Sequence, residues 1–249
     1  MNTTSGLDRC FTFINCQLQP RGPARREEDG LVRGVTISRQ SGCGACFFAE
    51  ELAVCLQAVL PHGARRWTVF DRDLVEAVLQ DHHLPARLAS FMPEDRVSQL
   101  NDIIEDLFSL HPPTETLVRR ASETILRLAQ LGNAIIVGRG ANVITARLPG
   151  MLHVRLVGSV EHRVAHMREF DHLDRKEALR RMTREDGGRR RYLKRYFGKD
   201  IDDPLLYHFV INTDWVSLQD AVKTVASFAL INHLALPAAK MAPAPSHDS

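Results

Sequence analysis

The segment VTISRQSGCGACFFA (35–49) has the residue types of a phosphate-binding turn, because an apolar run leads through two glycines into a helical pattern. Gly42 and Gly44 permit backbone conformations that other residues avoid. The start of the following helix offers unpaired N–H groups and the positive end of a dipole, which together suit phosphate. The alternative is a tight turn that holds no ligand.

The same segment departs from the standard phosphate loop. The pattern G-x-x-x-x-G-K-[ST] supplies a lysine for the β- and γ-phosphates and a hydroxyl for Mg²⁺. If Gly44 is the glycine before that lysine, Ala45 stands at the lysine position. In a register with one residue between the lysine and the hydroxyl, Phe47 stands at the hydroxyl position. A catalyst built on this loop must find positive charge elsewhere, and Arg39 or an arginine later in the chain could provide it.

Cys43 and Cys46 invite a redox or metal interpretation, since a thiol at a helix N-terminus has a lowered pKa. A zinc site needs a second cysteine pair at suitable spacing, and the chain has only five cysteines in all. Sparse, odd-numbered cysteines favour reduced thiols in a cytoplasmic protein. We therefore expect small buried thiols here.

A second glycine-bounded segment, VGRGA (137–141), follows another buried apolar run. Carboxyl ends of parallel strands meet at one edge of a sheet, so Arg139 should lie near the first loop. A guanidinium held between Gly138 and Gly140 suits a bidentate grip on phosphate. The alternative is an ion pair with Asp71 or Asp73.

Residues 175–199 carry eleven basic and three acidic side chains, whereas the net charge of the whole chain is only +2. Gly187 and Gly188 should act as a hinge or a helix break within this stretch. Three interpretations are open: a solvated helix face, a nucleic-acid-binding stripe with interleaved aromatic residues, and a mobile lid whose arginines close over a triphosphate. Two phosphate-type loops in the same chain favour the lid.

Periodicity predicts alternating strands and helices, and hence a parallel sheet with helices on both faces. The expected strands are 32–38, 67–70, 133–140, 151–158 and 208–214, and the expected helices are 47–60, 71–80, two within 93–131, 159–170, 174–199 and 218–234. A folded domain should span 31–235, between a flexible extension over 1–30 and a disordered tail over 236–249.

Composition excludes several classes of protein. Hydrophobic residues make up 44% and charged residues 25% of the 249 residues, which is the usual globular mix and argues against wholesale disorder. A net charge of +2 excludes a strongly basic coat. Neither a membrane span nor a signal peptide is expected.

Five segments occur in the order and spacing typical of one known family: ISRQSGCGA, FDRDLV, IIVGRGANVI, the helix after MLHVRLVG, and RRRYLKRYFGKDIDDPLLYHFVINT. Over roughly residues 32–230 the chain resembles the cytidylate-kinase-like family, relatives of the P-loop nucleoside monophosphate kinases. The resemblance implies an α/β fold with a P-loop NTPase-like parallel sheet and flanking helices. It also implies a helical acceptor-side insertion near 71–131 and a basic lid near 174–204.

The function implied by the resemblance is ATP-dependent phosphorylation of a nucleoside monophosphate, nominally CMP to CDP, with ATP and Mg²⁺ as cofactors. Residue by residue, it assigns ATP phosphates to Arg39, Ser41, Gly42, Cys43, Gly44, Ala45 and Cys46. It assigns the acceptor to Asp71, Arg72, Gly138, Arg139 and Gly140, and charge stabilisation to Arg190, Arg191 and Arg195. Metal ligands, the base and the oligomeric state are not specified.

One departure from the family bears on activity, because the family often carries Gly-Gly-Arg-Glu where this chain has Gly44-Ala45-Cys46-Phe47. Two alternatives therefore stay open. One is a nucleotide- or phosphoester-binding protein with weak or no kinase turnover. The other is a nucleic-acid-binding module that uses residues 175–199, although nucleic acid is not the expected partner.

Overall fold

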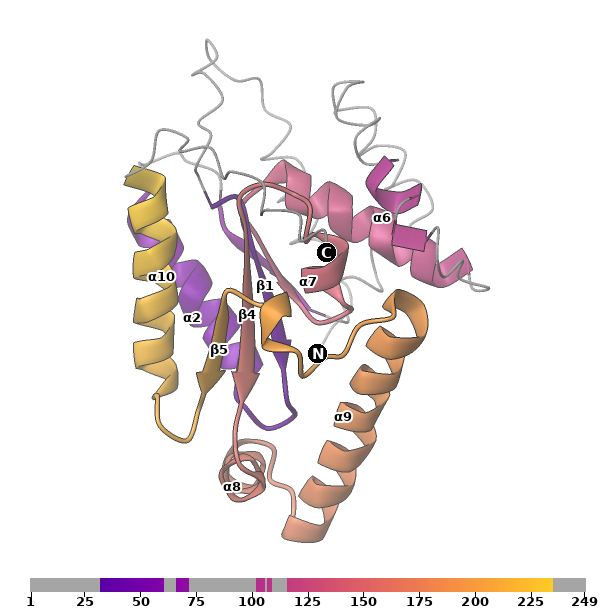
Figure 1. Ribbon diagram of the computed structural model, residues 1–249. Helices are drawn as coiled ribbons and strands as arrows, with labels where there is room; N and C mark the ends of the chain where they lie inside the picture. The colour runs from indigo at the N-terminus through magenta and orange to yellow at the C-terminus, as the bar shows by residue number, and fades with distance from the viewer. Residues whose placement is uncertain (1–31, 61–65, 72–101, 106, 109–115, 235–249) are drawn as a thin grey trace, which may run out of the picture.

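A five-stranded parallel sheet lies at the centre of the molecule, in the order β2-β3-β1-β4-β5 (Figure 1). The computed structural model describes residues 32–60, 66–71, 102–105, 107–108 and 116–234. The strands are β1 (Gly34–Arg39), β2 (Thr68–Phe70), β3 (Ala134–Val137), β4 (Met151–Val157) and β5 (Phe209–Asn212). All five strands expected from the sequence are present, within three residues at each end.

The register of β1 brings the two glycine-rich loops together. β1 pairs with β3 from Gly34↔Ala134 to Ile37↔Val137, and it pairs with β4 on its other side. Both loops leave the same edge of the sheet, and the N–H of Gly138 donates to the carbonyl of Ile37 at 2.9 Å. Residues far apart in the sequence therefore meet at one place.

Helices cover both faces of the sheet. On one face lie α2 (Ala45–Ala58) and α10 (Leu218–Leu234). The other face carries α6 (Thr116–Leu131), the short α7 (Ala141–Ile144) and the C-terminal end of α9 (Arg175–Phe197). Helix α8 (Val160–Phe170) packs against α9 beyond the carboxyl ends of the strands (Figure 1).

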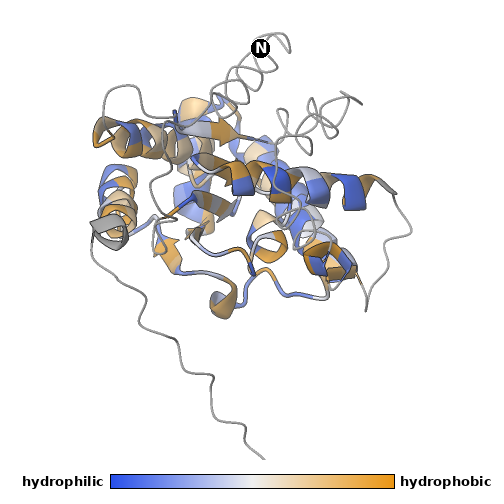
Figure 2. Cartoon of the chain, turned by 90° about the horizontal axis from the view of Figure 1, so that it is seen from above, coloured by the Kyte–Doolittle hydropathy of each residue, from blue (hydrophilic) through white to orange (hydrophobic). Residues whose placement is uncertain are grey.

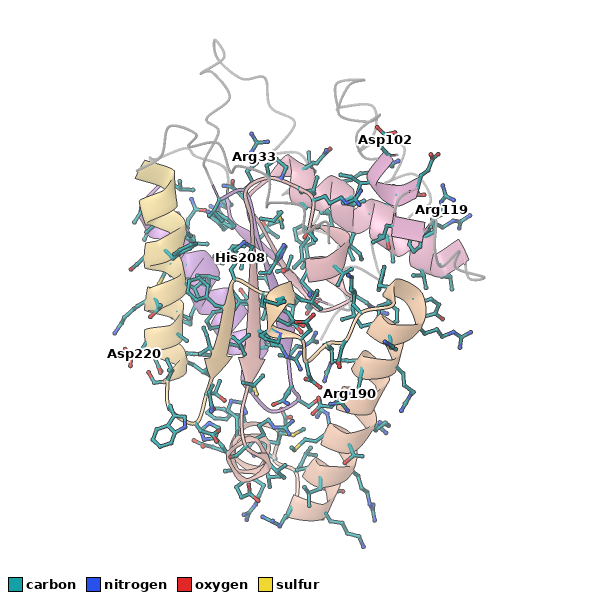
Figure 3. The ribbon with its side chains drawn as sticks, viewed as in Figure 1. Arg33, Asp102, Arg119, Arg190, His208 and Asp220 are labelled. Atoms are coloured by element: carbon teal, nitrogen blue, oxygen red, sulfur yellow. The ribbon has the colours of Figure 1, made fainter. Side chains whose placement is uncertain are left out.

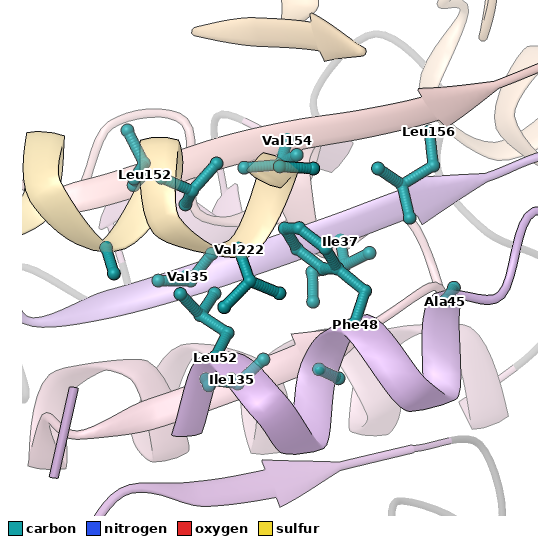
Figure 4. Packing of buried hydrophobic residues seen from close by; sticks show 14 of the residues in the cluster. Val35, Ile37, Ala45, Phe48, Leu52, Ile135, Leu152, Val154, Leu156 and Val222 are labelled. Carbon is teal, nitrogen blue, oxygen red and sulfur yellow. The ribbon is translucent and has the colours of Figure 1, made fainter. Parts of the chain in front are cut away.

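Successive side chains of a strand point to opposite faces of the sheet, so the strands contribute to a separate hydrophobic core on each face. Val35 and Ile37 face α2 and α10, where they pack against Phe48, Leu52 and Val222 (Figure 4). On β3, Ile136 faces α6 instead. Figure 2 shows apolar and polar residues side by side on the helices, as expected for helices with one buried and one solvated face.

Helix α9 differs from the expectation of a hinge. It begins at a capping box formed by Asp174 and Glu177 and continues through Gly187 and Gly188 to Gly198, which adopts φ 66°. The expected break at the two glycines is therefore wrong. Glycine costs about 1 kcal/mol relative to alanine within a helix, and contacts made by the neighbouring side chains outweigh that cost here.

Several expectations lie outside the described residues. These include the extension over 1–30, the tail over 236–249, the helix over 71–80 and much of the acceptor-side insertion. Residues 102–105 and 107–108 are helical and bring Ile104 and Phe108 into the α6 core. Within the described residues, no helix is long and apolar enough to span a bilayer.

Candidate functional site

The first loop joins β1 to α2 and is tightly packed. Gly42 and Gly44 adopt φ values of 86° and 67°, a region that favours glycine. A Cβ at Gly42 would lie 2.7 Å from the carbonyl oxygen of Arg163 in α8, and one at Gly44 would collide with Leu218. The loop therefore lies beneath the backbone of α8 and beside the start of α10.

The second loop has three successive residues in the left-handed region: Gly138, Arg139 and Gly140, with φ of 86°, 55° and 70°. A Cβ at Gly138 would collide with the guanidinium of Arg39. A Cβ at Gly140 would lie 3.0 Å from the ring of Phe197 at the end of α9. The side chain of Arg39 thus reaches from the end of β1 across to the second loop.

A cavity of about 390 Å³ opens between the end of β1, β4, α8 and α9. Six arginines line it: Arg39, Arg155, Arg163, Arg189, Arg190 and Arg191. Of the described residues that line it, Asp186 is the only one with a carboxylate. Figure 3 shows Arg190 at the carboxyl edge of the sheet. This excess of guanidinium groups suits an anionic ligand.

Asp186 of α9 lies in a three-donor cage at the first loop. Its Oδ1 accepts from the N–H of Ser41 at 2.8 Å and from Nη1 of Arg189 at 2.9 Å. Its Oδ2 accepts from Nη1 of Arg163 at 2.6 Å. A backbone N–H and two guanidiniums around one carboxylate are the donors that would hold a phosphate.

Glu185 makes a similar set of contacts beside Asp186. Its carboxylate accepts from Oγ of Ser41 at 2.7 Å, from Nη2 of Arg189 at 3.0 Å and from Nε of Arg181 at 2.9 Å. Partial burial acts to raise the pKa of Glu185. The hydrogen bonds from Ser41 and Arg181 and the charge of Arg189 outweigh it and bring that pKa down to about 2. The carboxylate is therefore charged at neutral pH.

Arg155 projects from the middle of β4 into the cavity. Its side chain is only 4% exposed, and its Nη2 donates to Asp202 at 2.6 Å. Its Nη1 donates to Oγ of Ser38 at 2.8 Å. Asp202 also accepts from Nη2 of Arg190 at 2.7 Å, so one carboxylate fixes two arginines. Burial acts to raise the pKa of Asp202, but the hydrogen bond from Arg190 and the charge of Arg155 lower it overall.

Residues 34–215 match the family model described as the Cytidylate kinase-like family. The chain belongs to the cytidylate kinase-like family. Among solved structures, an uncharacterized protein from Eubacterium ventriosum is similar at 20% identity and a TM-score of 0.53, with 80% of this chain and 98% of that chain covered. That likeness supports the fold.

Two shikimate kinases are more distant. The one from Bacteroides thetaiotaomicron has 12% identity and a TM-score of 0.39, with coverage of 79% of this chain and 97% of that chain. The one from Acinetobacter baumannii, in complex with shikimate, has 15% identity and a TM-score of 0.39, covering 83% and 97%. No curated protein matches the sequence.

The structure of this cytidylate kinase-like chain brings together some of the sequence-predicted residues but not all. Arg39, Arg190 and Arg191 line the cavity, and Arg139 follows Gly138, against which Arg39 lies. Arg195 does not line it, because its guanidinium lies 5.4 Å from the ring centre of Tyr196. Asp71 is exposed at the end of β2, while Arg72 and Asp73 lie outside the described residues.

The two cysteines of the first loop do not behave as reactive thiols. Cys43 is buried, as expected, but Cys46 is exposed, so the expectation of a buried thiol is wrong there. Loss of hydration raises the pKa of both thiols above the usual value. The lowered pKa expected at a helix N-terminus is therefore wrong in the direction that matters for redox chemistry. The described part of the chain contains no cluster of three or more His, Cys, Asp or Glu side chains that could hold a metal ion.

Sequence reasoning missed three arginines of the cavity, Arg155, Arg163 and Arg189. A signal existed for Arg155, since a charged residue within the apolar strand MLHVRLV is costly to bury unless it is paired. Arg189 is the first of the three arginines after the glycine pair, and only the next two, Arg190 and Arg191, were predicted as site residues. Arg163 carries no sequence signal, because an arginine in a surface helix is ordinary.

Proposed function

We propose that this protein transfers a phosphoryl group from ATP to a nucleoside monophosphate, nominally CMP. The observation that carries the proposal is the cavity lined by six arginines at the carboxyl edge of a kinase-like sheet. Ligands of open parallel sheets bind at this edge. Clustered guanidiniums match the charge of phosphoryl groups, both bound and in transfer.

In the proposed reaction an oxygen of the acceptor monophosphate attacks the γ-phosphorus of ATP. The bond from that phosphorus to the β,γ-bridging oxygen breaks, and ADP leaves with the electron pair. No general base is needed, because the acceptor phosphate, with a second pKa of about 6, is already a nucleophile at neutral pH. Catalysis then rests on positioning and on stabilising charge.

The roles follow the two loops. Residues Ser41 to Cys46 and Arg39 would hold the phosphates of ATP. Arg139, between Gly138 and Gly140, would hold the acceptor phosphate, with Asp71 and Arg72 at the edge of that site. Arg190 and Arg191 would neutralise the transferring group from α9. Arg195, on the same helix, does not line the cavity, and its guanidinium lies over the ring of Tyr196.

The residues of the first loop do not fit Mg²⁺. Phe47 stands where a P-loop kinase has a hydroxyl, and its ring is 44% exposed. The hydroxyl of Ser41 is hydrogen-bonded to Glu185 and Arg189. Mg²⁺ accompanying ATP would have to be held by the phosphates and water, as this ion often is, and the proposed steps involve no protein ligand to it.

A second candidate function is phosphoester binding without turnover. Ala45 and Phe47 favour it, because they remove the lysine and the hydroxyl that place charge and metal. Nucleic-acid binding is less favoured, because Arg163, Arg181, Arg189 and Arg190 are engaged by carboxylates at or near the cavity. Part of the positive charge of residues 175–199 is therefore compensated within the molecule.

The test is coupled ADP release with CMP, UMP or AMP as acceptor, beside a thermal-shift panel of the same nucleotides, ATP and RNA. A ligand at 100 times its Kd stabilises the fold by about 2.7 kcal/mol, roughly 5–11 °C for a chain of this size. We expect such a shift and turnover with at least one monophosphate. Shifts without turnover would favour the binding protein, and a shift with RNA alone would replace the kinase proposal.

A further inference from the structure

Arg39 lies between the two loops. Its backbone ends β1, at the entrance to the first loop, and its guanidinium lies against Gly138, which begins the second loop. It also lines the arginine cavity. A phosphoryl group that passes from a donor on the first loop to an acceptor on the second must pass this guanidinium.

The charge of Arg39 is compensated only in part within the described chain, by the nearby charge of Glu185. Arg155, Arg163, Arg189 and Arg190 each form a salt bridge with a carboxylate, whereas no carboxylate of the described residues forms one with Arg39. Burial and the nearby charges of Arg189 and Arg139 lower its pKa to about 10, so it stays cationic at neutral pH. A half-buried cation beside other cations is stabilised by an anion that enters the site.

The first loop lacks the charge that Arg39 could supply. Ala45 is 8% exposed and offers only a methyl group where P-loop kinases have a lysine. The neighbouring Cys46 is exposed. It lies close enough to Arg39 for each side chain to shift the pKa of the other. A cation at position 46 would therefore approach the position that Arg39 already occupies.

Resting on the proposed function, we propose that Arg39 is the catalytic cation that stabilises the transferring phosphoryl group, in place of the missing phosphate-loop lysine. As the bond from the γ-phosphorus to ADP breaks and the bond to the acceptor oxygen forms, negative charge spreads over the three equatorial oxygens. Arg39 donates hydrogen bonds to these oxygens. It forms no covalent bond and gives up no proton.

The principal test compares Arg39→Ala with Arg33→Ala in the full chain. Arg33 precedes β1, and Figure 3 shows it at the opposite end of the sheet from Arg190, so it is a matched control outside the site. We expect ADP release with CMP to fall on the order of 10²–10³-fold in Arg39→Ala, as for loss of one preorganised donor. Arg33→Ala should stay within about twofold of the wild type, the scatter of a neutral surface change.

A rescue variant separates a catalytic role from a structural one. Arg39→Ala/Cys46→Arg returns a guanidinium to the same place from the first turn of α2, and it should recover at least about tenfold in rate. Melting temperatures of the variants without ligand serve as the folding control. Because Arg39 is half-buried and no carboxylate of the described residues forms a salt bridge with it, its removal should not lower the melting temperature. Lost turnover together with a lowered melting temperature and no rescue would overturn the proposal.

A binding measurement keeps this inference distinct from the proposed function. The probe is inorganic triphosphate, followed by thermal shift on wild type, Arg39→Ala and Arg33→Ala. We expect Arg39→Ala alone to lose most of the shift. If the wild type turns over no nucleotide, the proposed function fails, yet a shift that depends on Arg39 still supports its place at the terminal phosphate. A triphosphate shift that survives in Arg39→Ala overturns the inference whatever the turnover.

Discussion

Gly138 leaves room for the guanidinium of Arg39 because it has no side chain. The guanidinium of Arg39 occupies the space where a Cβ of residue 138 would stand, and the backbone there has φ 86°. The glycine is therefore needed twice, for its conformation and for the approach of Arg39. This dual need explains why the second loop begins with glycine directly after a buried strand.

Gly138→Ala should therefore reproduce much of the defect of Arg39→Ala. The left-handed conformation costs an alanine about 1–2 kcal/mol, and the methyl group displaces the guanidinium. We expect lower stability in urea and weaker binding of inorganic triphosphate, measured on the same preparation. Gly132→Ala is the control, because it has φ 84° but its Cβ would meet only a carbonyl at 3.7 Å. Equal triphosphate binding in the two variants would show that Gly138 does not place Arg39.

At the scale of elements, α9 carries most of the site and holds itself to the first loop. Glu185 and Asp186 contact Ser41, and Arg189 contacts both acids, within one turn of the helix. Phe197 and Leu193 anchor the other end in the α6 core. Because both ends are fixed, the glycines between them remain helical.

Gly188→Ala should stabilise the protein. Gly188 lies within α9, and a Cβ there would meet no atom within 4 Å. Alanine loses less backbone entropy than glycine in a helix, so we expect a gain of about 0.5–1 kcal/mol in unfolding free energy by urea titration. A loss of stability would mean that residue 188 needs a conformation outside the helix, as a hinge requires.

Asp186→Asn tests what the docked carboxylate does. The amide removes the one carboxylate among the described residues that line the cavity and leaves Arg163 and Arg189 less compensated. We expect roughly tenfold tighter binding of inorganic triphosphate by titration calorimetry, together with a lower melting temperature without ligand. Weaker binding would instead show that the carboxylate serves to orient the two arginines. Asp220→Asn, at an exposed pair on α10, is the control.

At the scale of the whole molecule, acid should lower the stability of the protein over two successive pH ranges. His153 is buried against Thr36, 2.8 Å away, and burial with the nearby His208 lowers its pKa from 6.5 to about 4. The unfolded chain takes up this proton first, so stability falls as pH drops from about 6.5 to about 4. Glu185 keeps its charge down to about pH 2, so its contribution is lost only below about 4.5.

The measurement is the free energy of unfolding in urea between pH 7.5 and pH 4. His153 alone should contribute up to about 3 kcal/mol of the loss, from the difference between its two pKa values. His153→Gln keeps a polar partner for Thr36 and should flatten the curve above pH 4. An unchanged slope in this variant would assign the loss to other groups.

Local pattern was enough to predict the strands and most helices, because the apolar runs of β1, β3 and β4 are long enough to be buried. It also predicted that Arg139 follows a buried strand beside the first loop. Arg163 could not be assigned to the site, since only the packing of α8 brings it there. Arg155 stood out as a charge within an apolar strand, but only the pairing of β4 with β1 places it beside the first loop. The helix break was predicted wrongly because glycine propensity says nothing of Glu185 and Asp186 docking on Ser41.

Glu185 and Asp186 occupy hydrogen-bond donors that an incoming phosphate would need. A phosphate that enters the site therefore replaces these carboxylates instead of binding to free donors. A resting molecule with these two internal counter-ions has less need to recruit chloride from solution. An incoming phosphate then displaces carboxylates of the same chain, and fewer small ions are released to bulk solvent. Affinity should therefore fall less steeply with added salt than six arginines would suggest.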